Sequence, residues 1–255
     1  MTATANGARA KLRVRDDLTF ADLARALAAG WADFRRFPAF GLFFAAFYVV
    51  AGWALYFVLV QHGQWVWLVP AAGFPLIAPF TAVGMYEASR RREAGLPPDW
   101  RAVLGAVRGR GDGQVLGVGV VAFVIFCFWV IIGHGIFYIF MAQAGMTSES
   151  MAFFATPAGM AMLAVGTTVG AGFALLIFTL TAISLPMLVD RDMDCITAMI
   201  ASVSAVRANR AVMLGWAALI AVVLFAAMIP ALLGLLLALP LFAHASWHLY
   251  RRATA

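Results

Sequence analysis

The chain has 255 residues, of which 64% are hydrophobic and 12% are charged. Soluble domains carry about 25% charged residues, so this composition excludes an ordinary soluble protein and predicts an integral membrane protein. The formal net charge of +6 then reflects membrane topology rather than nucleic-acid binding. We therefore expect the lipid bilayer as the partner, with anionic headgroups at the cytoplasmic face and no nucleic acid.

The first 36 residues are the most polar part of the chain. Residues 1–17 lack the short apolar region and cleavage site of a signal peptide and predict a flexible cytoplasmic tail. Residues 18–36 predict an amphipathic helix, because apolar residues recur at steps of three and four. Its apolar face carries Phe20, Leu23, Leu27, Trp31 and Phe34, and its polar face carries Asp22, Arg25, Asp33 and Arg36.

A membrane-spanning helix needs about 20 apolar residues. Six segments meet this criterion: residues 38–60, 65–86, 114–141, 159–189, 211–228 and 230–250. The last two belong to one apolar stretch of 40 residues, 211–250, which as a single helix would reach about 60 Å, twice the hydrocarbon thickness. Because Pro230 offers a break, we expect a tight hairpin there.

The charges support six spans. With this count, all 18 Lys and Arg residues and 11 of the 12 acidic residues fall on one side, and Glu149 alone falls on the other. The positive-inside rule then places both the N- and the C-terminus in the cytoplasm. A five-span chain would expose Arg251 and Arg252 on the outside, against that rule.

A short polar helix is expected before each pair of spans, over 18–36, 99–110 and 192–209. All three should lie on the cytoplasmic interface or pack beneath the bundle. The predicted fold is an all-α polytopic membrane helical bundle. It has six transmembrane helices as three hairpins, each preceded by a cytoplasmic amphipathic helix, in a single membrane domain over 18–252. The other interpretation of the polar segments is three ordinary juxtamembrane loops.

Three segments carry a family resemblance: PFTAVGMYEASRR at 79–91, PMLVDR at 186–191 and LPLFAHASWHLYR at 239–251. Together they resemble an uncharacterised bacterial family of predicted integral membrane proteins, a domain-of-unknown-function family. The resemblance extends over about residues 20–252, and family members often have Gly where this chain has Ala243. It implies the bacterial inner membrane and no established reaction. Some members are labelled cytochrome c oxidase subunit I.

The four histidines argue against that label. A haem–copper core requires a larger set of histidine ligands inside the spans. A single bis-histidine haem would need two ligands at one depth, and only His62 and His134 approach this. We expect no cofactor.

His244 and His248 are four residues apart and share one helix face. Such a pair could bind a metal or a lipid phosphate, but we favour an interfacial pair that anchors the helix end beside Trp247, Tyr250 and Arg251. Metal binding is also open for the acidic residues at 190, 192 and 194, although helix capping explains them more simply. We predict no metal site.

Ion-coupled carriers usually hold ionisable residues within their spans. Glu87 comes nearest, at the inner end of the second span, where a neighbouring arginine can pair with it. In the same span, Gly73, Pro75 and Pro79 could unwind the helix and expose carbonyls, as in transporter sites, or form a structural kink. In the fourth span, Gly166 and Gly170 form a small-xxx-small pattern that favours helix packing over a polar path.

No catalytic motif such as GxSxG, HExxH or a P-loop occurs. We therefore expect no enzyme, but an accessory, assembly or scaffold subunit of a membrane complex. The alternatives are a transporter or channel for a small neutral or lipid-like solute, with a cavity near Pro75, Pro79 and the 167–181 face, and a membrane enzyme with a bound cofactor. The candidate functional or packing positions are Pro75, Pro79, Glu87, His134, Gly166, Gly170, Thr181, His244 and His248.

Overall fold

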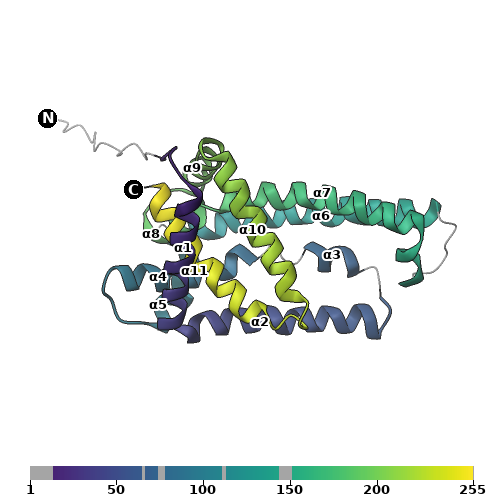
Figure 1. Cartoon of the computed structure of the whole chain (residues 1–255), viewed down its shortest axis with the longest axis horizontal. Coiled ribbons are helices and arrows are strands. Elements are labelled where there is room, and N and C mark those ends of the chain that lie inside the picture. Colours follow the sequence, from purple (N-terminus) through teal and green to yellow (C-terminus); the bar gives the residue numbers. More distant parts are fainter. Residues whose placement is uncertain (1–13, 65–66, 74–77, 111–112, 144–150, 255) are drawn as a thin grey trace.

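A computed structural model describes residues 14–64, 67–73, 78–110, 113–143 and 151–254. Every regular element in these ranges is helical, and they contain no strand, which confirms the all-α class for this part of the chain. Helices α6 (Gln114–Gln143) and α7 (Pro157–Thr181) lie side by side along the longest axis of the molecule (Figure 1).

Four of the described helical segments are long and apolar enough to cross a membrane. They are Pro38–Leu59, Gln114–Gln143, Pro157–Asp190 and Arg210–Met228. The first consists of α2 (Pro38–Tyr56) continued by the π-helical turn η1 (Phe57–Gln61), and the third joins α7 to α8 (Ser184–Asp190). The fourth is α10 (Arg210–Met228). At about 1.5 Å per residue these segments reach roughly 29–51 Å, which is sufficient for a bilayer.

The second expected span is not one continuous helix in the described residues. Its place is taken by α3 (Leu68–Gly73) and α4 (Ala78–Glu93), while residues 74–77 lie outside the described ranges. Helix α4 runs seven residues past the expected end at Tyr86 and carries Arg90, Arg91 and Arg92 in its last turn. These charges and the short length of α3 leave this segment outside the four apolar spans.

The sixth expected span begins later than predicted. Helix α11 covers Leu235–Ala253 rather than 230–250, because residues 229–234 form a turn in which Ala231 and Leu232 have positive φ angles of 49° and 67°. The indole N–H of Trp53 in α2 donates to the carbonyl of Ala231 at 2.8 Å and holds this turn. Since α11 is polar in its second half, the six-span count and the three hairpins stay a prediction.

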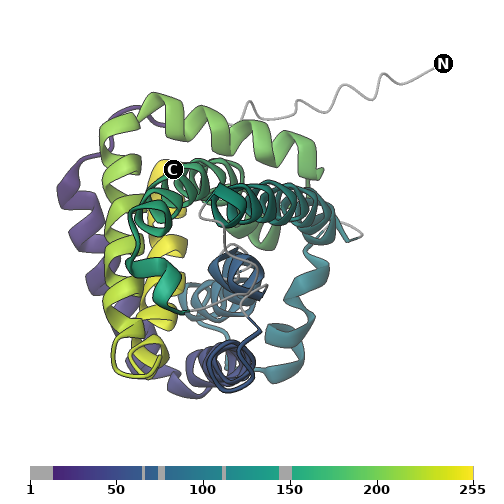
Figure 2. The same ribbon diagram turned by 90° about the vertical axis from the view of Figure 1, so that its right-hand side faces the viewer.

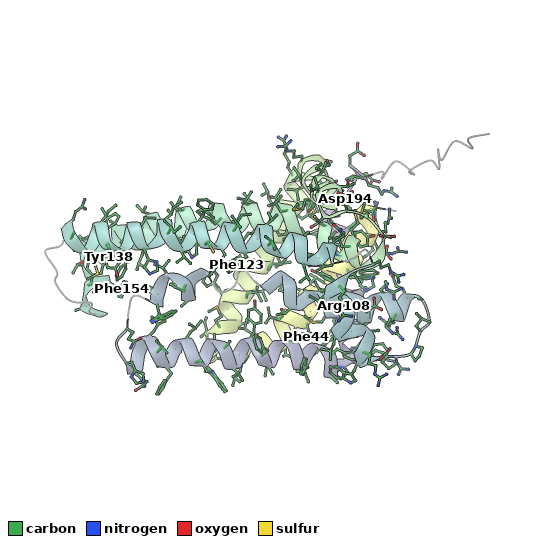
Figure 3. All side chains as sticks on the ribbon, turned by 180° about the vertical axis from the view of Figure 1, so that it is seen from behind. Phe44, Arg108, Phe123, Tyr138, Phe154 and Asp194 are labelled. Carbon is green, nitrogen blue, oxygen red and sulfur yellow. The ribbon has the colours of Figure 1, made fainter. Side chains whose placement is uncertain are left out.

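Three helices lie at the charged end, close to where the sequence predicts them: α1 (Phe20–Arg36), α5 (Trp100–Gly105) with the 3-10 turn η4 (Ala106–Arg108), and α9 (Cys195–Ala208). Each begins at a capping residue, namely Thr19, Asp99 and Asp194. Helix α9 runs across the axis of α6 and α7 (Figure 2). Nitrogen and oxygen atoms concentrate at this end, whereas carbon dominates along the long helices (Figure 3).

Two of these helices bury residues that were not expected to face inward. On α1, Asp22 and Asp33 are buried together with Leu23 and Phe34 of the expected apolar face, whereas Phe20 of that face is 61% exposed. On α9, Ile196 and Ile200 are exposed, whereas small residues such as Ala198 face the bundle. The small side chains allow close helix packing, and the large apolar ones remain available to the membrane interface.

The main hydrophobic core lies at the charged end. It joins α4, α8 and α11 through fully buried residues that include Met85, Leu185, Met187, Trp247 and Tyr250. Trp247 and Tyr250 are therefore core residues and not the interfacial rings expected from the sequence. A smaller cluster packs α3 against α6 and α7 at the opposite end, around Val69, Trp129 and Phe137.

Helices α1 and α11 approach each other so closely that Gly30 leaves no space for a side chain. A Cβ at Gly30 would lie 2.5 Å from the backbone nitrogen of Ala245 and 2.8 Å from its Cα. We expect Gly30→Ala to lower the free energy of unfolding by about 1–3 kcal/mol, because the clash is with backbone that cannot yield without moving a helix. Thermal unfolding in detergent measures this loss.

Gly135→Ala in α6 is the matched control, since a Cβ there meets nothing within 4 Å. The control should be neutral or stabilising, because alanine favours helix by about 1 kcal/mol. Equal melting temperatures for Gly30→Ala and the wild type would contradict the close approach of α1 and α11.

The two ends of the described chain are tied together by Asp22. Its carboxylate accepts from Thr19, from Arg25 at 2.6 Å and from Arg252 at 3.0 Å. Burial raises the pKa of Asp22, but these hydrogen bonds outweigh burial and hold the pKa below its ordinary value of 3.8. A group with a lowered pKa stabilises the fold above its unfolded-state pKa and loses that effect as pH falls.

We therefore expect Asp22→Asn to lower the melting temperature at pH 6–7, and the difference from the wild type to shrink as the pH is lowered below about 4. Asp16→Asn is the control, because Asp16 is exposed. A difference between Asp22→Asn and the wild type that is independent of pH would contradict an ionised, hydrogen-bonded Asp22.

Candidate functional site

A buried polar cluster joins three helices at the charged end. It consists of Asp33 from α1, Ser89 and Arg92 from α4, and His244 and His248 from α11; we call it the Asp33 cluster. The residues Asp33, Ser89 and His244 are each at most 1% exposed. Intramembrane or buried ionisable groups are the first place to look for function in a membrane protein.

Asp33 is the acceptor at the centre of the cluster. Its Oδ2 accepts from the hydroxyl of Ser89 at 2.5 Å and from Nε2 of His248 at 2.9 Å. Its Oδ1 accepts from the guanidinium of Arg92. Burying a carboxylate is costly unless it is paired and hydrogen-bonded, so these three donors from α4 and α11 are what permits Asp33 inside the protein.

Ser89 passes this hydrogen-bond pattern on to His244, whose Nδ1 lies 2.8 Å from the serine oxygen. A hydroxyl has one proton, and here it is donated to Asp33. His244 must therefore donate from Nδ1, which assigns its neutral tautomer and leaves Nε2 as an acceptor. That Nε2 atom is buried and has no hydrogen-bond partner among the described residues.

A second set of ion pairs surrounds the cluster on its exposed side. Arg251 binds Glu93 at 3.2 Å and Asp190 at 3.2 Å, and the hydroxyl of Tyr250 donates to Asp190 at 2.8 Å. Nδ1 of His248 lies 3.7 Å from Glu93. The charges of α4, α8 and α11 thus pair with one another across helix boundaries.

The chemistry of the cluster differs from that of a hydrolytic triad, although Ser, His and Asp are all present. In a triad, histidine lies between serine and aspartate and takes the serine proton. Here serine lies between Asp33 and His244, and it donates its proton to the carboxylate. The order of the three groups is therefore not that of the triad, and the buried serine has no exposed surface for a substrate.

The structure brings His244 and His248 together with partners that the sequence did not suggest. The expected interfacial pair at the helix end is wrong for His244, which is fully buried against α4. Within the described ranges, no group of three or more His, Cys, Asp or Glu residues could hold a metal ion.

The acidic residues at 190, 192 and 194 are separated in their roles. Asp190 binds Tyr250 and Arg251, and Asp194 caps α9 by accepting from the backbone N–H of Thr197 at 2.8 Å. Asp192 is exposed. Glu87 accepts two bonds from Arg90, each at 2.6 Å, within α4. Asp190, Asp194 and Glu87 therefore have structural partners.

The remaining candidate positions are dispersed. Nδ1 of His134 donates to the carbonyl of Val130 in its own helix at 2.8 Å. A Cβ at Gly170 would lie 3.1 Å from the ring of Trp129, so this glycine serves the packing of α6 on α7, whereas Gly166 faces open space. Thr181 donates to the carbonyl of Ile177. Pro75 lies outside the described residues, and Pro79 falls in the first turn of α4.

Sequence reasoning missed Asp33 and Ser89, although a signal was present. Asp22, Ala26, Gly30 and Asp33 follow each other at steps of four, four and three, which places them on one face of α1. Small residues between two carboxylates indicate a face that packs against another helix, and all four are buried.

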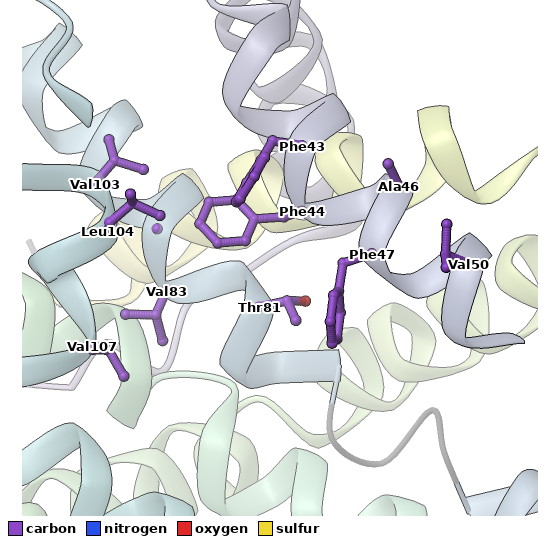
Figure 4. A pocket seen from close by; sticks show the side chains of 11 residues that line it. Phe43, Phe44, Ala46, Phe47, Val50, Thr81, Val83, Val103, Leu104 and Val107 are labelled. Carbon is purple, nitrogen blue, oxygen red and sulfur yellow. The ribbon is translucent and has the colours of Figure 1, made fainter. Parts of the chain in front are cut away.

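An apolar groove lies beside this site, between α2, α4 and α5. Its volume is about 630 Å³, and we call it the α2–α4–α5 groove. It is lined by Phe43, Phe44, Ala46, Phe47, Val50, Thr81, Val83, Gly84, Val103, Leu104 and Val107 (Figure 4). The cavity expected near the 167–181 face is not where this groove lies, since none of these residues belongs to α7.

One comparison with known proteins indicates a membrane protein. Residues 67–190 match the model of a family described as a predicted integral membrane protein (DUF2189). No curated protein and no solved structure matches the chain. The matched range includes α4 and α8, and with them the segment 79–91 that carries part of the resemblance. The resemblance of this integral membrane protein to an uncharacterised membrane protein family is therefore confirmed over residues 67–190.

Proposed function

We propose that the protein is a non-catalytic accessory, assembly or scaffold subunit of a complex in the bacterial inner membrane. The observation that carries this proposal is the use of the buried and half-buried carboxylates. Asp22, Asp33, Glu87 and Asp190 each bind an arginine, and three of these four bonds join different helices. Carboxylates held in such ion pairs stabilise the fold and are not free to act on a substrate.

The proposed topology has six spans with both termini in the cytoplasm. The four apolar segments are joined by α3 with α4 and by α11, whose 19 residues reach about 28 Å, close to the hydrocarbon thickness. The backbone N–H of Arg15 donates to the carbonyl of Ala253 at 2.9 Å, so both ends of the described chain lie on one side. Anionic headgroups would meet the arginines there.

Transport of a small neutral or lipid-like solute is the second candidate. It is favoured by the α2–α4–α5 groove, which is apolar apart from Thr81. The groove suits hydrocarbon better than a polar solute, because a polar ligand would find few hydrogen-bond partners there.

Ser89→Ala tests the non-catalytic proposal. The variant removes the hydroxyl at the centre of the Asp33 cluster, so we expect a loss of about 1–3 kcal/mol in stability from the unsatisfied neighbours. Gentle affinity purification from membranes should nevertheless recover the same partner proteins at permissive temperature. Ser204→Ala on the exposed side of α9 is the control.

If Ser89→Ala loses the partner proteins, this loss agrees with the proposal only when another variant of similarly low stability loses them too, because lower stability then explains both losses. The stability-matched Gly30→Ala variant provides that comparison. A wild-type protein that purifies as a monomer without stable partners would overturn the proposal of an accessory subunit.

Labelling of single cysteines tests the topology. In a chain with Cys127 and Cys195 replaced by alanine, we expect a membrane-impermeant maleimide to label Ile229→Cys from outside intact spheroplasts. Ala208→Cys should be labelled only after the cells are opened, and a C-terminal green fluorescent protein should fluoresce. Labelling of Ala208→Cys from outside would contradict the orientation, and a dark C-terminal fusion would contradict α11 as the sixth span.

A further inference from the structure

The α2–α4–α5 groove has a buried floor and exposed walls. Val83 and Val103 at its floor are each 1% exposed, and Gly84 between them is also buried. On its walls, Phe47 and Leu104 are 67% and 50% exposed. Figure 4 shows these walls arising from α2 on one side and α5 with η4 on the other. The groove is therefore open along the surface of the bundle and is not an enclosed cavity.

Its depth in the membrane follows from α2. Phe43 to Val50 lie five to twelve residues after Pro38, where the apolar span begins at the charged end. At about 1.5 Å per residue this range corresponds to roughly 8–18 Å from that end. The groove thus faces the acyl chains of the leaflet on the charged side of the protein. An occupant at this depth must be apolar, because the hydrocarbon region offers no water to polar groups.

Two arginines next to the groove have guanidinium groups without a partner in the part of the chain that the structure describes. Arg101 and Arg108 stand three residues before and four residues after Leu104, on the segment that forms one wall. Both are exposed, and neither guanidinium has an ion pair or hydrogen bond among the described residues. In contrast, Arg90, Arg91 and Arg92 on the neighbouring helix α4 are all paired.

We propose that the α2–α4–α5 groove binds one anionic phospholipid. Its acyl chain lies along the groove, and its phosphate is held by Arg101 and Arg108. The guanidinium suits this role because it binds phosphate oxygens with paired, charge-assisted hydrogen bonds. The apolar walls and the unpaired cations are separate features of one short segment, and a phospholipid satisfies both. This site does not depend on the accessory function proposed above.

The experiment must distinguish a lipid bound in the groove from the lipids that merely surround the protein. The test uses wild-type protein reconstituted in nanodiscs with phosphatidylglycerol or phosphatidylcholine, then transferred to mild detergent and examined by native mass spectrometry. We expect retention of one phosphatidylglycerol molecule and much weaker retention of phosphatidylcholine. Equal retention of the two lipids by the wild type would overturn the proposal.

The double variant Arg101→Gln with Arg108→Gln should weaken retention of phosphatidylglycerol roughly 30-fold, the scale expected for two surface arginines. The matched control is Arg207→Gln with Arg210→Gln. It removes the same charge from two exposed arginines where α9 ends and α10 begins. An equal loss in both double variants would show a general charge effect and overturn the site.

Leu104→Trp tests the groove itself by filling it with a larger side chain. We expect it to reduce retention of phosphatidylglycerol, whereas Leu116→Trp at an exposed position of α6 leaves retention unchanged. Melting temperatures of both variants show whether each is folded. If the wild type forms a dimer that Leu104→Trp dissociates, the occupant is a second copy of the chain and the lipid proposal is wrong.

Discussion

The buried carboxylate of Asp33 is the constraint on which the charged end of the structure depends. A carboxylate with 1% exposure must be compensated, and its donors come from two other helices: Ser89 and Arg92 from α4 and His248 from α11. Removing one donor from a buried charge costs more than the bond itself, because the charge stays behind. The three helices must therefore keep one register. Gly30 sets the distance between two of them, since its missing side chain brings α1 onto the backbone of α11.

This constraint joins distant parts of the chain. Helix α1 follows the N-terminal segment, and α11 ends the chain, so their contact closes the bundle on itself. Asn209 strengthens the closure from α9, because its amide accepts from the backbone of Leu18 at 3.0 Å and donates to the carbonyl of Arg15 at 2.7 Å. Most buried polar interactions thus lie at one end, and the opposite end is held mainly by the smaller apolar cluster around Trp129. At the charged end, polar contacts therefore fix how neighbouring helices sit against one another.

The sequence predicts the helices better than it predicts their neighbours. Apolar runs and caps place α2, α6, the segment of α7 with α8, and α10 within a few residues, because spanning length and helix periodicity are local properties. The Asp33 cluster joins residues up to 215 positions apart, and no local pattern specifies such a contact. Two carboxylates of the polar face of α1, Asp22 and Asp33, are buried, because partners on α4 and α11 compensate their charges, whereas Arg25 and Arg36 on that face are exposed. The spacing of Asp22, Ala26, Gly30 and Asp33 at steps of three and four indicates a buried face of α1. Hydrophobicity alone does not reveal this face, because two of its residues are charged.

Some arginines of this protein bind buried carboxylates, and others have no such partner among the described residues. Arg92 and Arg252 end at buried carboxylates and belong to the fold, because their partners would otherwise be uncompensated. Arg101 and Arg108 pair with no carboxylate among the described residues, so these contacts do not explain why two cations flank an apolar groove. In a bilayer, an unpaired guanidinium at the headgroup level meets phosphate. The ion pairs of Arg92 and Arg252 with buried carboxylates therefore stabilise the fold, and Arg101 and Arg108 lie where the protein would meet lipid phosphate.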